Sequence, residues 1–337
     1  MTRRTLLPVL RHIVSRPTAP FHEEAVAEAI RGFLKELPHV SVRTDKHGNL
    51  IARYERAGGK SGRARYAFAA HMDHPGWVRA DSHSPGPAVR LPGEKHPMQF
   101  LGGVPEPWLK NPSVRGYGRF AMWDLREFQL RDGIIHARAC DDLIGCAVIV
   151  AMFIELERTA AEGICLGLFT RAEEVGFIGA MKLAASGLLP DDLTIISLET
   201  SSERPPAKIG AGPILRVGDK TSIFDSAATA NLAQIAADSH IPVQRCLMPG
   251  GTCEATAYQL AGYRSAALCV ALGNYHNCGP KNQIAPEYVS FSDVQSLVRL
   301  CTKIAVSRAK KNQAVKALKK RLKTNAEKYR KMLKKRV

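Results

Sequence analysis

The sequence contains no apolar stretch of the roughly 18 to 20 residues that a membrane-spanning helix requires. Residues 6–10 (LLPVL) follow Arg3 and Arg4 in the manner of a signal peptide, but this run is too short. His12 and Arg16 also stand where a signal peptide needs small residues for cleavage. We therefore expect a cytoplasmic protein whose first segment forms an amphipathic helix.

The eight cysteines include no CxxC pair and follow no regular spacing. Cys146, Cys165 and Cys269 lie within apolar runs, where a reduced thiol behaves as a small hydrophobic side chain. In a chain of 337 residues this usage argues against a disulfide framework and favours a reducing compartment. It leaves histidine and carboxylate side chains as the candidate metal ligands.

Acidic residues are scarce only in the last part of the chain. From Arg308 onward there are fourteen Lys and Arg residues against the single Glu327, so about thirteen of the seventeen net positive charges lie there. The rest of the chain is mildly basic. Any inference about nucleic acid or membranes therefore concerns this basic tail, residues 307–337.

Apolar residues recur in the tail at intervals of three and four, as they do on one face of a helix. They are Val315, Leu318, Leu322, Ala326, Tyr329 and Leu333. Two interpretations stay open: a solvated terminal helix, or a helix that contacts nucleic acid or an anionic membrane surface. Aromatic residues are not interleaved with the basic ones, so no specific nucleic-acid-binding module is indicated.

The composition, 45% hydrophobic and 23% charged, is that of a globular protein. Strand-like and helix-like segments alternate after Gly133, with helices predicted at 143–157 and 176–186 and strands at 164–170 and 193–199. This pattern predicts an α/β fold with a mixed, largely parallel sheet sandwiched by helices.

The segment 76–130 has a different texture from the rest of the chain. It is rich in Pro and Gly, contains all three tryptophans and shows no long helical periodicity. We expect it to form a small β-rich inserted domain that acts as a lid or in oligomerisation. The flanking segments 1–75 and 131–306 would then form one discontinuous catalytic domain.

Four strand-like apolar runs lead to side chains that can bind metals. These side chains are His71 after RYAFAA, Glu173 and Glu174 after ICLGLFT, Glu199 after LTIISL, and His276 after SAALCVAL. The carboxyl ends of the strands of an open parallel sheet face one crevice, where ligands bind. We therefore expect these side chains to lie close together.

Two adjacent acidic pairs, Asp141–Asp142 and Glu173–Glu174, suggest a division of labour within each pair. Either aspartate alone could cap the predicted helix at 143–157. Adjacent carboxylates repel each other unless a cation or a shared proton intervenes, and a metal accounts for both pairs. Histidines and carboxylates without cysteine indicate a hydrolytic site for two Zn²⁺ or similar divalent ions.

The motif His71-Met72-Asp73 adds a supporting contact. In an extended stretch, side chains at i and i+2 point the same way, so Asp73 can accept the second ring N–H of His71. An HxD motif on its own is more often structural. At a strand end ahead of the two acidic pairs, we interpret it as a metal ligand and its supporting carboxylate.

Taken together, these motifs resemble those of a known family. The run to Glu199 and the motifs AAHMDHPGW, ARACDDLIGCAV, TRAEEVGFIGA, GAGPILRVGD, PGGTCEA and NYHN occur in the order and approximate spacing of the tetrahedral (deblocking, glutamyl) aminopeptidases. The resemblance extends over residues 5–306. These are two-metal exopeptidases related to the aminoacylase/carboxypeptidase and leucine-aminopeptidase families. They carry a small domain between the HxD and DD motifs, where this chain has its Pro- and Gly-rich insert.

The resemblance implies the metal ligands. His71 and Glu199 would bind one divalent ion, and Glu174 and His276 the other, with Asp141 bridging both. Zn is the expected metal, with Co or Mn as alternatives.

The resemblance also implies Glu173 as the general base and Asp73 as the residue that orients His71. The chain departs from the family in two places, since Glu199 and Cys253 stand where an aspartate is common. The insert is shorter than usual, so a homo-oligomer is expected without assuming the family's twelve-subunit assembly.

These observations favour a metal-dependent exopeptidase that removes N-terminal residues from peptides. The alternative is a metal-dependent amidohydrolase that acts on N-acyl amino acids or related small amides. A phosphoesterase and a non-enzymatic binding role of the tail are more remote. The sequence does not separate peptide from acyl-amino-acid substrates, because loops and a neighbouring subunit can supply the pocket.

Overall fold

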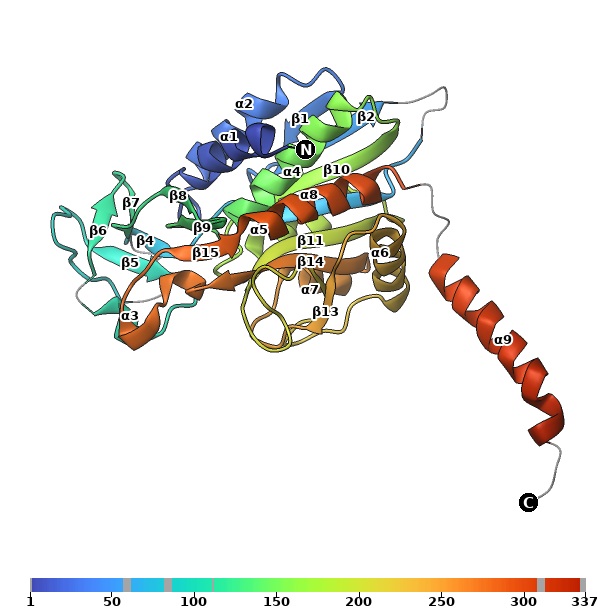
Figure 1. Ribbon diagram of the computed structural model, residues 1–337. Helices are drawn as coiled ribbons and strands as arrows, with labels where there is room; N and C mark the ends of the chain where they lie inside the picture. Colours follow the sequence, from blue (N-terminus) through green and yellow to red (C-terminus); the bar gives the residue numbers. More distant parts are fainter. Residues whose placement is uncertain (1, 57–61, 82–86, 111, 308–312, 334–337) are drawn as a thin grey trace.

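The structure is a computed structural model that describes residues 2–56, 62–81, 87–110, 112–307 and 313–333. Within these residues the main sheet has eleven strands, in the order β1-β2-β10-β3-β11-β14-β15-β9-β8, with β12 beside β14 and β13 beside β12 (Figure 1). The strands are β1 (Val40–Thr44), β2 (Leu50–Arg56), β3 (Tyr66–His71), β8 (Phe128–Arg131), β9 (Ile134–Ala137), β10 (Gly163–Thr170), β11 (Thr194–Ser202), β12 (Ile214–Gly218), β13 (Gln244–Leu247), β14 (Arg264–Gly273) and β15 (Glu287–Ser290).

The centre of this sheet is parallel. Strands β10, β3, β11 and β14 run in the same direction, and their outer neighbours β2 and β15 run against them. β3 is buried along its whole length, as expected for a strand that is covered on both faces. Its alternate side chains enter different cores: Tyr66, Phe68 and Ala70 face one, and Ala67 and Ala69 face the other.

Helices cover both faces of the sheet (Figure 1). The larger core lies under α1 (Arg3–Val14), α2 (Glu24–Leu34), α4 (Leu143–Arg158), α6 (Ser226–Asp238) and α8 (Phe291–Ala305). The smaller core lies under α5 (Ile178–Ala184) and α7 (Glu254–Leu260). α4 is buried along almost all of its length, because it lies against the sheet and also contacts α1, α2 and α8. The predicted α/β class, with a largely parallel sheet between helices, is confirmed.

A second, antiparallel sheet has the order β5-β4-β7-β6. Its elements are β4 (Gly76–Arg79), β5 (Met98–Leu101), the short helix α3 (Glu106–Leu109), β6 (Val114–Gly116) and β7 (Phe120–Trp123). The rings of Trp77 and Trp123 pack edge to face in its core, with 4.3 Å between their centroids. β8 instead pairs with β9 in the main sheet, so the boundary predicted at residue 130 falls inside a strand of that sheet. Composition does not reveal which sheet a short strand joins.

Three elements near the C-terminal part of the body have no counterpart in the sequence prediction. They are β15 and the two short 3-10 helices η1 (Tyr275–Asn277) and η2 (Pro280–Asn282). In the tail, α9 (Gln313–Leu333) projects away from the body (Figure 1). Residues 308–312 and 334–337 of the predicted tail, and the side chain of Leu333, lie outside the described part. Among the described helices, none has the length and apolar character needed to cross a membrane.

Candidate active site

The structure brings the predicted site residues together at the carboxyl ends of the central strands. His71 is the last residue of β3, and Glu173 and Glu174 follow β10 after a short turn. His276 lies in η1, just beyond β14. Glu199 lies inside β11 and not at its end, because this strand continues three residues further than the sequence predicts. Parallel strands expose their carboxyl ends along one edge, which explains the convergence.

The carboxylate of Asp141 lies between the two imidazole rings. Its Oδ1 atom is 3.6 Å from Nε2 of His71, and its Oδ2 atom is 3.6 Å from Nε2 of His276. On the far side, Nε2 of His276 is 3.2 Å from Oε1 of Glu174. Asp141 is 3% exposed, so its carboxylate is largely shielded from bulk solvent.

Two overlapping groups of ligand atoms result, and both contain Asp141. The first consists of Asp141, His71 and Glu199, and the second of Asp141, Glu174 and His276. Within each group the ligand atoms lie within 4.8 Å of one another. A third group of the same kind joins His71 to Glu173 and Glu174.

Several of these buried atoms have no hydrogen-bond partner among the described residues. They are Oδ1 of Asp141, Oε1 of Glu174 and Nε2 of His276. Burying a polar atom without a partner is costly, and coordination to a cation removes that cost. Imidazole nitrogens with carboxylate oxygens and no thiolate suit Zn²⁺ and similar divalent ions. The residues present therefore fit a divalent metal centre.

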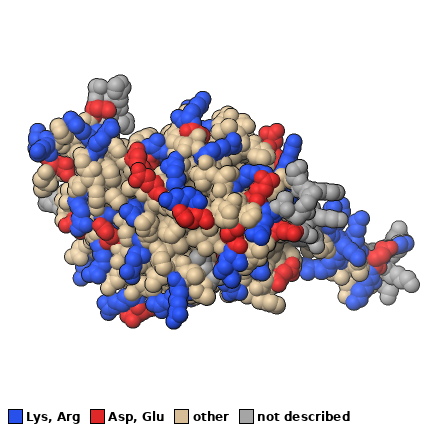
Figure 2. Space-filling model, turned by 90° about the horizontal axis from the view of Figure 1, so that it is seen from above, with Lys and Arg blue, Asp and Glu red and all other residues tan. Residues whose placement is uncertain are grey.

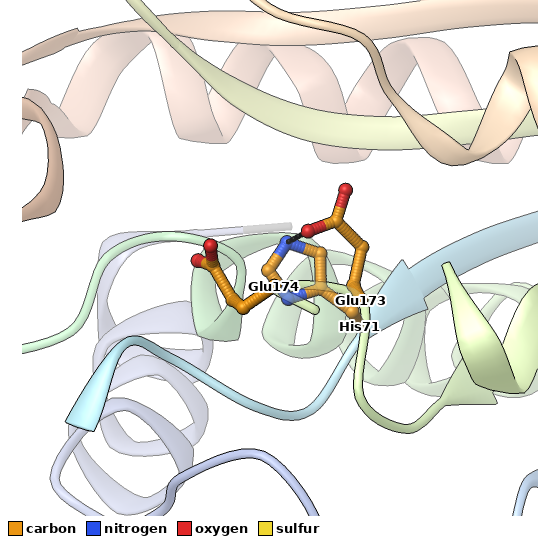
Figure 3. A group of neighbouring side chains, drawn as sticks. All are labelled: His71, Glu173 and Glu174. Atoms are coloured by element: carbon orange, nitrogen blue, oxygen red, sulfur yellow. Dashed lines mark ion pairs between the residues drawn. The ribbon is translucent and has the colours of Figure 1, made fainter. Parts of the chain in front are cut away.

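Glu173 stands beside this group with its side chain turned towards His71 (Figure 3). Its Oε2 atom is 4.0 Å from Nε2 of His71. It is also one of the residues that line the adjacent cleft, together with His71, Asp141 and Glu199. Glu173 is thus near the ligand atoms and accessible from the cleft.

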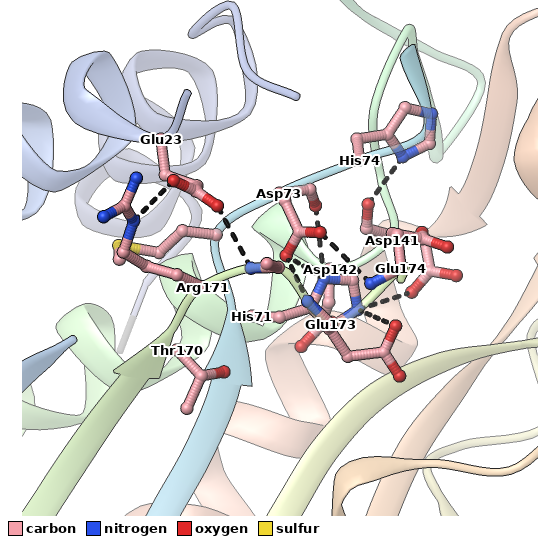
Figure 4. Close-up of polar contacts among 12 residues, drawn as sticks. Glu23, His71, Asp73, His74, Asp141, Asp142, Thr170, Arg171, Glu173 and Glu174 are labelled. Atoms are coloured by element: carbon pink, nitrogen blue, oxygen red, sulfur yellow. Dashed lines mark hydrogen bonds and ion pairs between the residues drawn. The ribbon is translucent and has the colours of Figure 1, made fainter. Parts of the chain in front are cut away.

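Asp73 fixes the position of the Glu173–Glu174 pair. Its carboxylate oxygens accept the backbone N–H groups of Glu173 at 3.0 Å and of Glu174 at 3.1 Å (Figure 4). The sequence predicted a contact between this carboxylate and the ring of His71. In the structure Nδ1 of His71 is 3.5 Å from Oδ1 of Asp73 and 3.2 Å from the Asp73 backbone oxygen. The carboxylate therefore lies next to the ring and is hydrogen-bonded to the glutamate backbone.

The turn before Glu173 is tied to α2 by a buried carboxylate. Glu23 accepts the side-chain Nε–H of Arg171 at 2.6 Å and the backbone N–H of Ala172 at 3.0 Å (Figure 4). Glu23 is 1% exposed. The turn is thus held from both sides, by Glu23 and by Asp73.

The pKa values reflect the concentration of negative charge. Burial raises the pKa of Glu173 well above its ordinary value, and neighbouring carboxylates raise it further against the opposing effect of His71. Burial also raises the pKa of Glu199 to about 7. Burial acts on Asp141 in the same sense, but the adjacent imidazole rings of His276 and His71 outweigh it, so the pKa of Asp141 lies below its ordinary value. Carboxylates so arranged are stabilised by a bound cation.

A cleft opens beside the ligand atoms. It is also lined by Arg204, Arg216, Met248, Thr252 and Tyr275. The guanidinium of Arg216 donates to the hydroxyl of Ser201 at 3.2 Å, and its Nε atom has no partner among the described residues. The cleft thus joins a negatively charged floor to a positively charged wall.

Comparison with known proteins agrees with this geometry. The model of the family described as M42 glutamyl aminopeptidase matches residues 116–297, which is more than half of the chain. The chain belongs to the M42 glutamyl aminopeptidase family. The resemblance to the tetrahedral aminopeptidases that the motifs indicated is thereby confirmed.

Two curated bacterial proteins, both provisionally named aminopeptidases, match this M42 member. One, from Acetivibrio thermocellus, is 28% identical over 178 residues, which cover 51% of each chain. The other, FrvX from Escherichia coli strain K12, is 29% identical over 168 residues, which cover 47% of this chain and 44% of FrvX. The chain thus spans about half the length of the curated relatives it matches.

Solved structures of TET peptidases share the fold. The TET aminopeptidase of a marine-sediment Thaumarchaeota archaeon superposes with a TM-score of 0.75 at 17% identity, over 92% of this chain and 98% of the other. The TET1 peptidase of Pyrococcus horikoshii gives a TM-score of 0.71 at 20% identity, over 90% and 99% of the two chains. An aminopeptidase of the M18 family from Thermotoga maritima gives 0.64 at 12% identity, over 90% and 97%.

One buried residue of this M42 member that sequence reasoning missed is Glu287. Its carboxylate accepts the backbone N–H groups of Cys140 at 2.6 Å, Asp141 at 3.0 Å and His276 at 2.8 Å. Glu287 is fully buried. It therefore fixes the backbone of two predicted ligands at once. It lies in APEYVS, where no motif in the sequence marks it.

His74 is a second missed residue, and a signal for it was present in the sequence. It lies three residues after His71 in the motif AAHMDHPGW. Its Nδ1 atom is 2.7 Å from the backbone oxygen of Asp141, and its Nε2 atom is 3.0 Å from Oδ1 of Asn277. His74 thus links the segments that carry Asp141 and His276.

Three further residues that the sequence analysis singled out, Asp142, Glu199 and Cys253, make contacts within the protein. Asp142 caps α4 by accepting the backbone N–H of Gly145 at 3.1 Å, the alternative that the sequence left open for an aspartate of this pair. Glu199 accepts the hydroxyl of Ser197 at 2.9 Å. Cys253, the other departure from the family pattern, is 1% exposed and packs in a small apolar cluster with Phe224. Its thiol is turned into the protein interior.

Proposed function

We propose that the protein is a metal-dependent aminopeptidase that hydrolyses the first peptide bond of its substrates. The observation that carries this proposal is the Asp141 carboxylate between the rings of His71 and His276, with Glu173 beside it at the cleft. Membership of the M42 glutamyl aminopeptidase family supports the same reaction.

In the proposed site, His71 and Glu199 would hold one divalent ion, and Glu174 and His276 would hold a second. Asp141 would serve both, since its carboxylate oxygens lie 3.6 Å from Nε2 of His71 and of His276. The ion is Zn²⁺, for which Co²⁺ or Mn²⁺ can substitute. Two such ions supply a water of lowered pKa and a polarised scissile carbonyl.

Glu173 acts as the proton carrier. We assign to its Oε2 atom the proton of the attacking water, which it then delivers to the leaving amine. Asp73 acts through Glu173 and is a positioning residue, since its carboxylate holds the Glu173 backbone N–H.

The cationic wall of the cleft supports an acidic first residue in the substrate. Arg204 and Arg216 both line the cleft, and a guanidinium group pairs well with a carboxylate. A desolvated guanidinium favours a carboxylate and disfavours an apolar or cationic side chain in the same position. The glutamyl specificity in the family's description agrees with this choice.

We further propose a homo-oligomeric, cytoplasmic enzyme. The TET1 structure of Pyrococcus horikoshii is described as a tetrahedron or a large octahedral shell, and its fold is shared here. The eight cysteines, which all lie in the described part, are free and mostly buried, as suits a reducing compartment.

The proposal is tested by hydrolysis of aminoacyl p-nitroanilides by the Zn²⁺-reconstituted protein, with free and N-acetylated forms compared. Cleavage of the free-amine forms only, lost on chelation, is the expected result, with the glutamyl substrate hydrolysed faster than the leucyl one. Cleavage of the acetylated forms would instead establish an amidohydrolase.

A further inference from the structure

The tail helix α9 has one exposed apolar face. Val315, Leu318, Leu322 and Tyr329 lie within roughly 60° of one another at the 100° per residue of an α-helix. Their side chains are 41%, 45%, 56% and 50% exposed, so the body of the protein does not bury them. α9 contacts α6 and projects away from the sheet (Figure 1). We refer to these four residues as the apolar stripe.

The rest of the α9 surface is cationic. Seven Lys and Arg side chains lie outside the arc of the stripe: Lys316, Lys319, Lys320, Arg321, Lys323, Lys328 and Arg330. The single acidic residue of the helix, Glu327, is 3.2 Å from Arg330. Figure 2 shows Lys and Arg covering this projecting part. Most of the positive charge is therefore left unpaired within α9.

We propose that α9 is a membrane-surface helix that holds the protein on anionic bilayers. The apolar stripe would enter the boundary between headgroups and acyl chains, and the flanking cations would contact anionic headgroups. Two features of α9 support this assignment, its cationic surface and its exposed apolar stripe. An anionic bilayer complements both. The proposal does not depend on the reaction of the active site.

Other partners satisfy only one of the two features. A nucleic acid would neutralise the cations but would leave the apolar stripe in water. A second copy of α9 could cover the stripe, but it would bring two strongly cationic helices together. The anionic bilayer is therefore the occupant to which the helix is matched.

The test measures the binding of the full-length protein to sedimented vesicles of phosphatidylcholine, with and without phosphatidylserine. The double substitution Leu318→Gln/Leu322→Gln removes stripe residues without changing the charge. The matched control, Ala317→Gln/Thr324→Gln, places the same side chains on the cationic face. Circular dichroism checks the helix content of both, and turnover of a soluble peptide checks the body.

Binding to phosphatidylserine vesicles only, lowered roughly tenfold or more by Leu318→Gln/Leu322→Gln but not by the control pair, is expected. An oligonucleotide should retain its affinity for both variants, since it contacts the cations alone. Equal vesicle binding by the two variants would overturn the proposal, because the stripe would then contribute nothing. The absence of vesicle binding, or tighter binding to RNA than to phosphatidylserine vesicles, would also overturn it.

Discussion

The carboxylate of Asp73 accepts the backbone N–H of Glu173 at 3.0 Å, across one hundred residues of sequence. Asp73 lies two residues beyond the end of β3, and Glu173 lies three residues beyond the end of the neighbouring parallel strand β10. The bond therefore joins the exits of two adjacent strands at the edge where the site lies. It sets the place of the proposed base relative to His71.

Substitution of Asp73 by Asn should lower kcat by about 10- to 100-fold with little change in KM. Asn offers one oxygen where two N–H groups are bound, and its own N–H₂ group would face one of these donors. Steady-state kinetics of the Zn²⁺-loaded protein measures the effect. Asp132→Asn, on the surface, is the matched control and should behave as the unaltered protein. Unchanged kcat in Asp73→Asn would refute the positioning role.

Substitution of Glu287 by Gln should lower the free energy of unfolding of the metal-free protein by about 2 to 5 kcal/mol. The carboxylate accepts three buried backbone N–H groups, and the Gln amide cannot accept all of them. Urea unfolding at pH 8.5 is the measurement, because burial raises the pKa of Glu287 to about 7 and it is ionised there. Glu36→Gln, on the surface, should change stability by less than about 0.5 kcal/mol. A similar small effect of Glu287→Gln would count against the account.

The metal-free protein should become less stable as pH rises from about 5 to 8. Burial raises the pKa of Glu199 and Glu287 to about 7 and of Glu254 to about 8, so the folded state holds protons that the unfolded state releases. Burial lowers the pKa of His71 and His276, but the surrounding carboxylates outweigh it and raise the pKa of both rings. These raised values also make the folded state less stable as pH rises. Differential scanning calorimetry with a chelator present should show a falling midpoint over this range. Zn²⁺ should reverse the trend, because it binds the deprotonated ligands. A midpoint that rises with pH in the chelated protein would contradict these pKa shifts.

Substitution of Arg216 by Gln should lower the ratio of kcat/KM for glutamyl over leucyl p-nitroanilide by about tenfold. The guanidinium lines the cleft and is 4% exposed, so its charge is poorly screened. Lys208→Gln, an exposed change outside the cleft lining, should leave the ratio unchanged. An unaltered ratio in Arg216→Gln would remove Arg216 from substrate selection.

The predictable part of the site consisted of residues next to long apolar runs. His71 and the Glu173–Glu174 pair follow strands that are buried on both faces, and such strands are visible as unbroken apolar segments. Parallel pairing then brings their ends together. The end of β11 was set too early because Thr200 and Ser201, although polar, continue the strand beside β14.

The contacts between side chains and distant backbone could not be read from the sequence. Glu287 reaches the backbone of Cys140 and His276 from a four-residue strand that composition does not reveal. The same holds for β8, whose pairing with β9 depends on the path of the chain and not on its residue types. The pattern of apolar residues thus predicted the sheet and the helices that cover it. The polar contacts that fix the site depend on the tertiary structure and could not be predicted in this way.

The most direct test of the account compares Glu173→Gln with Glu174→Gln, two adjacent and isosteric changes, by measuring bound Zn²⁺ and turnover of a free-amine p-nitroanilide. The account predicts that Glu173→Gln keeps its metal and loses about 10²- to 10⁴-fold in kcat, whereas Glu174→Gln loses metal as well as activity. Metal loss in Glu173→Gln, or wild-type turnover in that variant, would contradict the assignment of Glu173 as the base beside a metal centre.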